Sequence, residues 1–148
     1  MKIRGFEIVS KYHNQDISLP ERKTTGSAGY DIACAQDTVI EPKSFKFVPT
    51  GIKAYMGKDE VLEVYPRSSL SFKKHLVKLN SVGIIDSDYY NNPDNEGEIM
   101  LILYNYGTEK ILLKKHERIA QGLFMKYLTI DNDETEVKRL GGLGSTGN

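Results

Sequence analysis

"FKFVPTGIKAYMGKDEVLEVYP", residues 45–66, indicates most clearly what kind of fold this chain forms. Apolar and polar residues alternate in Phe45-Lys46-Phe47 and again in Leu62-Glu63-Val64-Tyr65, which is the period of a half-buried strand. Turn-forming residues separate the runs: Pro49, Gly51, Gly57 and Pro66. The stretch therefore predicts short strands joined by tight turns.

The same pattern continues on both sides of this stretch. Similar short apolar runs precede and follow it: "FEIVS", "YDIACA", "TVIEP", "LVKLNSVGIID", "IMLILYNYG" and "KILLKK". Helical periodicity is convincing nowhere, and the best helix candidate is "SSLSFKKHL", residues 68–76. Many short strands at regular spacing predict an all-β sandwich or barrel.

The composition narrows the class of protein. A length of 148 residues fits one domain, and 20 Lys and Arg balance 20 Asp and Glu, which argues against nucleic-acid binding through bulk charge. The single cysteine, Cys34, fits a reducing compartment, and we expect it to be a small buried residue. No stretch is apolar enough for a leader or a membrane span, so we expect a cytoplasmic protein without membrane contacts. His13, His75 and His116 lie in polar contexts and are expected at the surface.

The strand pattern ends after Leu128, in the acidic stretch "TIDNDETEVK" and the glycine-rich "GLGSTGN", residues 142–148. Gly142, Gly144 and Gly147 have the G-x-G-x-x-G spacing of a dinucleotide site, and Gly142 and Gly147 also have the spacing of a P-loop. Both motifs need a helix directly after them, and no helix-forming stretch follows. We expect a β domain over residues 1–128, then an acidic connector and a flexible arm over residues 129–148.

Four interior stretches combine small and polar residues within the strand pattern. In "GSAGYDIAC", Asp31 interrupts an apolar strand, although a lone Asp also suits a turn. "YPRSSLSFKKHL" offers Arg67, Ser68 and Ser69 as phosphate donors, and a polar turn is an equally good interpretation. In "HERIAQGLF", the amide of Gln121 lies in an apolar strand and needs a partner.

The most informative stretch is "LNSVGIIDSDYYNN". The apolar residues Val82, Ile84 and Ile85 lead directly into Asp86, and a carboxylate fixed at a strand end can orient or deprotonate a water molecule. The alternative is a β-turn, which Asp-Ser-Asp also favours.

In this order, five stretches resemble the five motifs of the trimeric dUTPase family: "AGYDIAC", "PRSSL", "NSVGIIDSDYY", "ERIAQGLF" and "GGLGSTG". The resemblance runs from Ala28 to the last residue. It implies a distorted jelly-roll or β-barrel subunit in a homotrimer with composite active sites. It also implies the hydrolysis of dUTP to dUMP and pyrophosphate by attack of water on the α-phosphate. Such an enzyme limits uracil incorporation into DNA and supplies dUMP for thymidylate synthesis.

The resemblance also implies a role for each matching residue of the barrel. Asp86 would be the catalytic base, and Tyr89 would press against the deoxyribose. The uracil edge would be read by Asn80, Gly83, Ile84, Ile85 and the strand near Met100. The phosphates would be held by Arg67, Ser68, Ser69 and Gln121. Asp31 would contact, through water, a Mg²⁺ ion carried by the triphosphate.

The arm would cross to a neighbouring subunit and close over its nucleotide. Arg139, Ser145 and Thr146 would grip the phosphates, and Gly144 would let the backbone approach them. Leu143 stands where the family usually has a Phe, so it would cover the base without aromatic stacking. Arg139 also lies closer to the glycines than in the commonest spacing.

The sequence departs from the family pattern at one further place, and it leaves two alternative functions open. "YNNPDNE", residues 90–96, is longer than the usual hairpin connection, and we expect a protruding surface loop. A dCTP deaminase of the same fold would need a glutamate near the pyrimidine, where this chain has "GIIDSDYY". The other alternative is a non-catalytic, regulatory trimer that binds nucleotide or a protein partner.

Overall fold

The computed structural model describes residues 1–146, which fold almost entirely into antiparallel strands. The strands are β1 (Gly5–Ile8), β2 (Tyr30–Ala33), β3 (Thr38–Ile40), β4 (Phe45–Pro49), β5 (Ile52–Tyr55), β6 (Glu60–Pro66), β7 (Leu76–Lys78), β8 (Gly83–Asp86), β9 (Met100–Asn105), β10 (Ile111–Leu113) and β11 (Arg118–Lys126). The helical elements are α1 (Ser68–Lys74) and two short 3₁₀ turns, η1 (Ser10–Tyr12) and η2 (Ser87–Tyr89). The all-β prediction is confirmed, and α1 lies inside the predicted helical stretch.

The strands form a four-stranded sheet in the order β2-β11-β6-β8, a three-stranded sheet β4-β9-β7, and the pairs β1-β5 and β10-β3. Gly51 lies where the chain leaves β4 for β5 in a different sheet, and its φ of +72° is one that glycine adopts without strain. The inner faces of the sheets share one core, whose fully buried members include Ile32, Leu62, Leu76, Leu101, Leu103, Leu113 and Ile119. Cys34 packs in this core and His13, His75 and His116 are exposed, as the sequence predicts.

The outer face of the four-stranded sheet carries most of the polar candidate residues. Paired residues in an antiparallel sheet point to the same face. The register pairs Asp31 with Gln121, Gln121 with Tyr65, and Val61 with Asp86. Since Val61 and Tyr65 are four residues apart on β6, all five of these side chains share one face.

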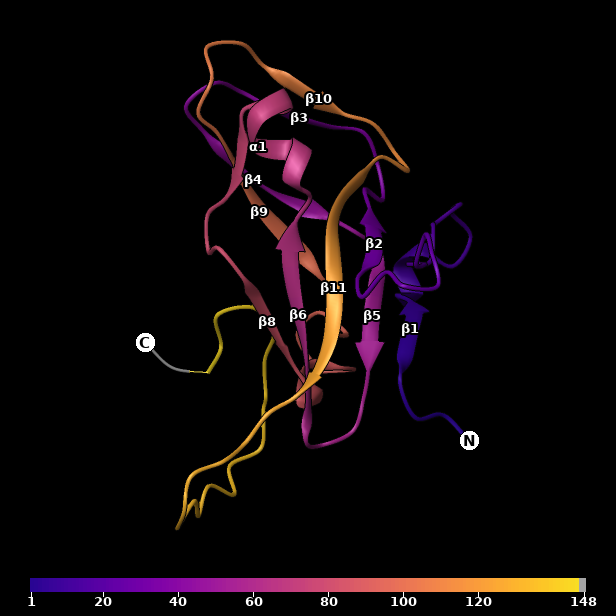
Figure 1. Cartoon of the computed structure of the whole chain (residues 1–148), viewed down its shortest axis with the longest axis vertical. Helices are drawn as coiled ribbons and strands as arrows, with labels where there is room; N and C mark the ends of the chain where they lie inside the picture. Colours follow the sequence, from indigo (N-terminus) through magenta and orange to yellow (C-terminus); the bar gives the residue numbers. More distant parts are fainter. Residues whose placement is uncertain (147–148) are drawn as a thin grey trace.

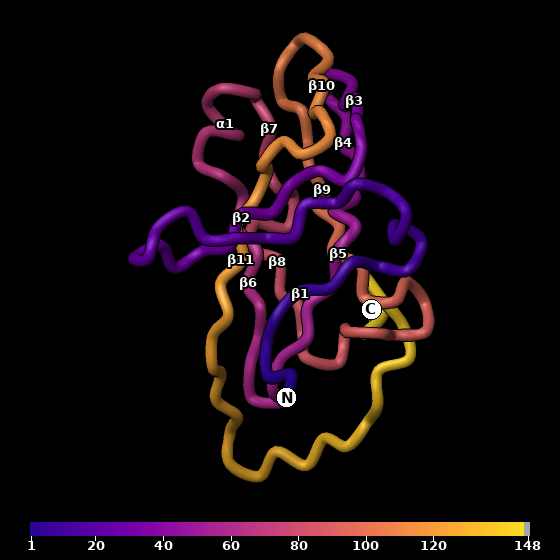
Figure 2. Tube along the Cα trace, turned by 90° about the vertical axis from the view of Figure 1, so that its right-hand side faces the viewer, coloured from indigo at the N-terminus to yellow at the C-terminus, as the bar shows by residue number. Residues whose placement is uncertain are grey.

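The chain beyond β11 takes a long path around the molecule. Residues 127–146 contain neither helix nor strand. They swing away from the end of β11 in a wide loop and return beside β8 (Figures 1 and 2). In the described part of the chain, no helix has the length and apolar character needed to cross a membrane.

Candidate active site

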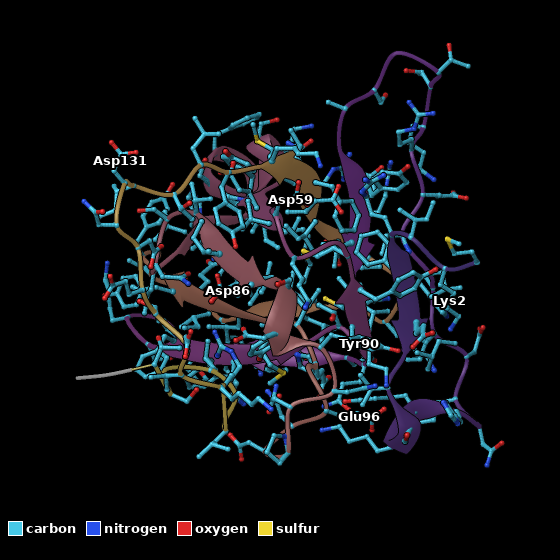
Figure 3. The ribbon with its side chains drawn as sticks, turned by 90° about the horizontal axis from the view of Figure 1, so that it is seen from below. Lys2, Asp59, Asp86, Tyr90, Glu96 and Asp131 are labelled. Carbon is cyan, nitrogen blue, oxygen red and sulfur yellow. The ribbon has the colours of Figure 1, made fainter. Side chains whose placement is uncertain are left out.

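Asp86 ends the short apolar strand β8, which places its carboxylate at a fixed position at the edge of the sheet. Asp86, labelled in Figure 3, pairs through its backbone with Val61 of β6. Its side chain is 49% exposed. The next residues form the 3₁₀ turn η2, so the stretch is both a strand end and a turn. A carboxylate that is fixed by its strand and open to water can act on a water molecule.

Arg139 of the arm binds this carboxylate within the same chain. Its Nη2 donates to Asp86 Oδ2 at 2.6 Å and its Nε donates to Asp88 Oδ1 at 2.8 Å. The guanidinium also lies over the Tyr89 ring, 5.5 Å from the centroid, and the Arg139 side chain is only 7% exposed. Two carboxylates and an aromatic face therefore hold a nearly buried cation against the proposed base.

The other arm residues turn around Arg139. Its Nη1 donates to the carbonyl of Gly142 at 3.4 Å and to Ser145 Oγ at 3.3 Å. Leu143 and Thr146 are exposed, and Gly144 has a φ of +74° in the turn. Gly147, the third glycine of the spacing noted above, lies outside the described residues.

Tyr89 is buried beneath this contact. Its hydroxyl donates to the Glu98 carbonyl at 2.9 Å and accepts from Asn95 Nδ2 at 2.8 Å. Burial raises the pKa of the Tyr89 phenol, so it stays protonated at neutral pH. These two hydrogen bonds therefore fix the Tyr89 ring at the bottom of the site.

The loop of residues 90–96 connects the site to the N-terminal strand and to the arm. Tyr90 donates to Glu7 on β1, and Glu96 accepts from Lys53 at 2.6 Å (Figure 3). On the other side, Asp94 Oδ2 accepts from the Gly142 amide at 3.3 Å. The loop lies at the surface as predicted, but it does not protrude freely, because polar side chains tie down both of its sides.

A second polar cluster lies at the far end of the same sheet face. Asp31, Arg67 and Gln121 line a pocket of about 490 Å³ together with Arg118. Arg118 Nη1 donates to Asp31 Oδ2 at 3.1 Å. A side chain at Gly29 would come within 2.5 Å of Gln121 Oε1, so the glycine leaves room for the amide. The pocket offers cationic and amide donors, which suit phosphate oxygens.

Ser68 and Ser69 form the first turn of α1, directly after Arg67, but they do not line this pocket. Asn80 is exposed in the turn between β7 and β8, and its Oδ1 accepts from Lys78 Nζ at 2.5 Å. The Leu79 amide donates to the Ile102 carbonyl, so the chain at Asn80 runs toward the Met100 end of β9. Asn80 thus follows β7 toward Met100 of β9, whereas β8 pairs with β6 in the other sheet. That these segments together form the base pocket stays a prediction.

The two clusters do not meet within one chain. Asp86 and Gln121 are separated by two strand spacings and by the four residues from Val61 to Tyr65. These offsets place the two backbone positions roughly 16 Å apart. Apolar residues of the same face lie between them: Ile84, Leu123 and Met125.

Sequence reasoning missed several residues of the site. Asp88 and Asp94 hold the arm, Asn95 holds Tyr89, and Arg118 holds Asp31. In the sequence, these residues were marked only by lying inside or next to one of the motifs described above. Within residues 1–146, no three His, Cys, Asp or Glu side chains cluster as a metal site would require.

Comparison with known proteins identifies the group to which these features belong. The family model described as dUTPase matches residues 15–147. The deoxyuridine 5'-triphosphate nucleotidohydrolase of Lactococcus lactis is 53% identical over 149 aligned positions, which cover 99% of both chains. The crystal structure of the dUTPase from Streptococcus mutans superposes with a TM-score of 0.83 at 47% identity, over 86% of this chain and 98% of that one. A dUTPase from phage phi11 of S. aureus, whose structure reveals the coordination of a structural Mg(II) ion, shares the fold at 19% identity and a TM-score of 0.74, over 92% of this chain and 98% of that one.

Proposed function

The chain belongs to the dUTPase family and is a dUTP hydrolase, and we propose that Asp86 is its general base. The supporting observation is the half-exposed carboxylate at the end of β8, next to a cation supplied by the arm. Water attacks the α-phosphorus as Asp86 accepts its proton. The bond from the α-phosphorus to the bridging oxygen breaks, and the products are dUMP and pyrophosphate.

Arg139 links this chemistry to nucleotide binding. Its guanidinium donates to the Asp86 carboxylate within the same chain. Phosphate oxygens are strong bidentate partners for a guanidinium and compete with the carboxylates for it. Transfer of Arg139 from Asp86 to the phosphates frees the base when the nucleotide is bound, and it places a cation where negative charge develops.

We further propose a jelly-roll homotrimer whose sites combine residues from different chains. A water molecule between Asp86 and the α-phosphorus spans only about 3 Å on each side. The phosphate pocket of the same chain, roughly 16 Å away by strand register, is therefore too far from Asp86 to complete the site. The apolar residues between the clusters, with Ile84 56% exposed and Met125 46% exposed, suit contact with another copy.

The arm can make the same contacts on a neighbouring chain. Residues 127–138 have no helix or strand to fix their path, and exchange of an identical segment between protomers preserves each contact. We propose that in the trimer Arg139, Ser145 and Thr146 close over a neighbour's nucleotide, with Leu143 covering the base.

Mg²⁺ fits this site as an ion bound to the triphosphate. The described residues offer Asp31 and no three-ligand cluster, and Asp31 Oδ2 already accepts from Arg118. Mg²⁺ prefers phosphate oxygens and retained waters, so one carboxylate that contacts it through water is sufficient. When bound, the ion neutralises phosphate charge, while Arg67, Ser68, Ser69 and Gln121 hold the phosphates.

Pyrophosphate release measured with dUTP, UTP, dTTP and dCTP tests this function. We expect a strong preference for dUTP, because Tyr89 excludes a 2′-hydroxyl and a site with fixed polar groups rejects analogues by factors of up to ~10⁴. Comparable kcat/KM for dUTP and UTP would refute the role of Tyr89. Ammonia release from dCTP would instead identify the deaminase alternative, and tight dUTP binding without turnover would identify the regulatory one.

A further inference from the structure

Lys78 is a buried lysine that has no carboxylate partner among the described residues. It is the last residue of β7 and is 7% exposed. Among residues 1–146, no Asp or Glu forms an ion pair with it, and burial lowers its pKa from 10.5 to about 8. A buried unpaired cation destabilises a fold, so its presence beside a candidate site calls for a functional reason.

The ammonium of Lys78 contacts the turn that carries Asn80. Lys78 Nζ donates to Asn80 Oδ1 at 2.5 Å. On its other side, a Cβ placed on Gly83 would come within 2.9 Å of Nζ, so the absence of a side chain there makes room for the ammonium. The Ser81 amide donates to the Lys78 carbonyl at 3.1 Å and closes the turn above it. Lys78 is thus enclosed by the segment predicted to read the base.

This contact determines which way the Asn80 amide faces. An ammonium has donors only, so it must meet the carbonyl oxygen of the Asn80 side chain and not its NH₂ group. With the oxygen directed at Lys78, the exposed side of the amide presents the NH₂ group, which is a donor. Without a fixed neighbour, rotation by a half turn would present the oxygen instead.

We infer that Lys78 is a positioning residue for base selection: it fixes the Asn80 amide so that an N–H donor faces position 4 of the pyrimidine. This inference rests on the proposed function, in which Asn80 reads the base. Uracil carries an acceptor at position 4, O4, which pairs with that donor. Cytosine carries an amino group there, so the same arrangement sets two donors against each other and leaves both unpaired.

Lys78→Met tests the inference, because Met has a similar length and no donor. We expect the ratio of kcat/KM for dUTP over dCTP, measured by pyrophosphate release, to fall roughly tenfold to a hundredfold, the size of one mispaired buried polar contact. The ratio of Kd for dCMP over dUMP should fall with it, since it reports the same selection without catalysis. Lys46→Met is the matched control: Lys46 lies opposite the same residue, Leu103, but is exposed, and its loss should leave both ratios unchanged.

An unchanged ratio in Lys78→Met would overturn the inference. If both activities fall by the same factor, the ratio is also unchanged, and Lys78 is then a purely structural residue. If the unaltered protein fails to hydrolyse dUTP, the proposed function itself is wrong, and that outcome is separate from both.

Asn80→Asp gives an independent test that retains Lys78. The ammonium would hold one carboxylate oxygen and leave the other facing the base, which replaces the outward donor with an acceptor. We expect dUMP to bind more weakly and dCMP more tightly, so that the preference shifts toward cytosine. Retention of the original preference for dUMP would contradict the orientation argument.

Discussion

Asp86 and Lys78 place two charges at the ends of consecutive short strands, β8 and β7, and they differ in exposure to water and in their partners. Asp86 remains 49% exposed and binds Arg139, whereas Lys78 is 7% exposed and, within residues 1–146, its ammonium donates only to the Asn80 amide. An accessible carboxylate is able to exchange one partner for another, from a guanidinium to a water molecule. An enclosed ammonium cannot, and it acts by holding its neighbour in place. The same kind of position therefore suits the proposed proton transfer at Asp86 and the proposed orientation of Asn80 by Lys78.

Asp86→Asn is expected to reduce kcat for dUTP by ~10²–10⁴-fold, because the amide cannot accept a proton from water. The amide is nearly isosteric and can still accept a hydrogen bond from Arg139, so nucleotide binding should survive. Stopped-time pyrophosphate assays give kcat, and calorimetry gives the Kd for dUTP. A near-normal kcat would show that Asp86 is structural.

Lys78→Met should also change stability in a manner that depends on pH. The folded-state pKa of Lys78 is about 8, below the ordinary 10.5, so between these values the unfolded chain binds a proton that the folded chain does not. The free energy of unfolding of the parent protein should therefore gain a contribution that rises from pH 8 to 10.5 and amounts to at most about 3 kcal/mol. Below pH 8 the whole cost of the buried charge is present, and Lys78→Met should be the more stable protein there.

Urea unfolding of the parent, Lys78→Met and Lys46→Met at several pH values measures this effect. The difference between Lys78→Met and the parent should shrink as the pH rises through this range, while Lys46→Met should follow the parent. A difference that does not depend on pH would mean that Lys78 is not titrating in the folded protein. A gain in stability combined with a loss of selectivity would mark Lys78 as a residue whose function conflicts with stability.

At the scale of elements, local pattern predicted the strands and the position of Asp86 but not the contacts between distant segments. Alternation in residues 45–47 and 62–65 corresponds to β4 and β6, because each strand has one face in the core. By contrast, "LVKLN" is consistent with a solvated lysine, and its burial follows only from the packing of β7 against β9 and β6. The loop of residues 90–96 gave no signal for its contact with Gly142, since their separation of about fifty residues is bridged only by the tertiary fold.

Asp94→Ala should loosen the docking of the arm on this loop. The change removes the acceptor for the Gly142 amide and leaves the barrel core untouched. A hydrogen bond to a partly exposed carboxylate contributes about 1 kcal/mol, so the undocked population should rise roughly fivefold. Arg139 is 7% exposed when docked, and trypsin cleavage after it should therefore accelerate by a similar factor.

Asp131→Ala is the matched control, because Asp131 is an exposed acidic residue of the connector. Its cleavage rate after Arg139 should equal that of the parent. Equal cleavage rates in Asp94→Ala and the parent would show that the loop of residues 90–96 does not hold the arm.

At the scale of the whole molecule, the outer sheet face carries two separate polar clusters, which we propose are two parts of one composite site. Asp86 and its arm contact lie at one end, the pocket lined by Asp31, Arg67 and Gln121 lies at the other, and Ile84, Glu63 and Leu123 lie between them. In the proposed assembly, association of identical chains brings the Asp86 end of one subunit to the pocket of the next. The single-chain fold thus accounts for the parts of the site, and the assembly proposed above accounts for their combination.

Whether the arm closes over its own chain or over a neighbour is decided by mixing two inactive proteins. A chain truncated after Lys138 should fold, because the strands end at Lys126 and the removed residues contribute little to the core. It should be nearly inactive, since Arg139, Ser145 and Thr146 no longer close the site. Asp86→Asn with an intact arm should be inactive for lack of the base.

If base and arm come from different chains, random assortment on co-expression makes about one quarter of the sites complete. The rate of dUTP hydrolysis should then return to about the same fraction of the rate of the unaltered protein. The two proteins purified separately and mixed without exchange of subunits provide the control, which should stay inactive. If the Arg139 to Asp86 contact of the single chain persists in the assembly, every site lacks either the base or the arm. Co-expressed chains that are as inactive as each variant alone would therefore exclude the crossed arm.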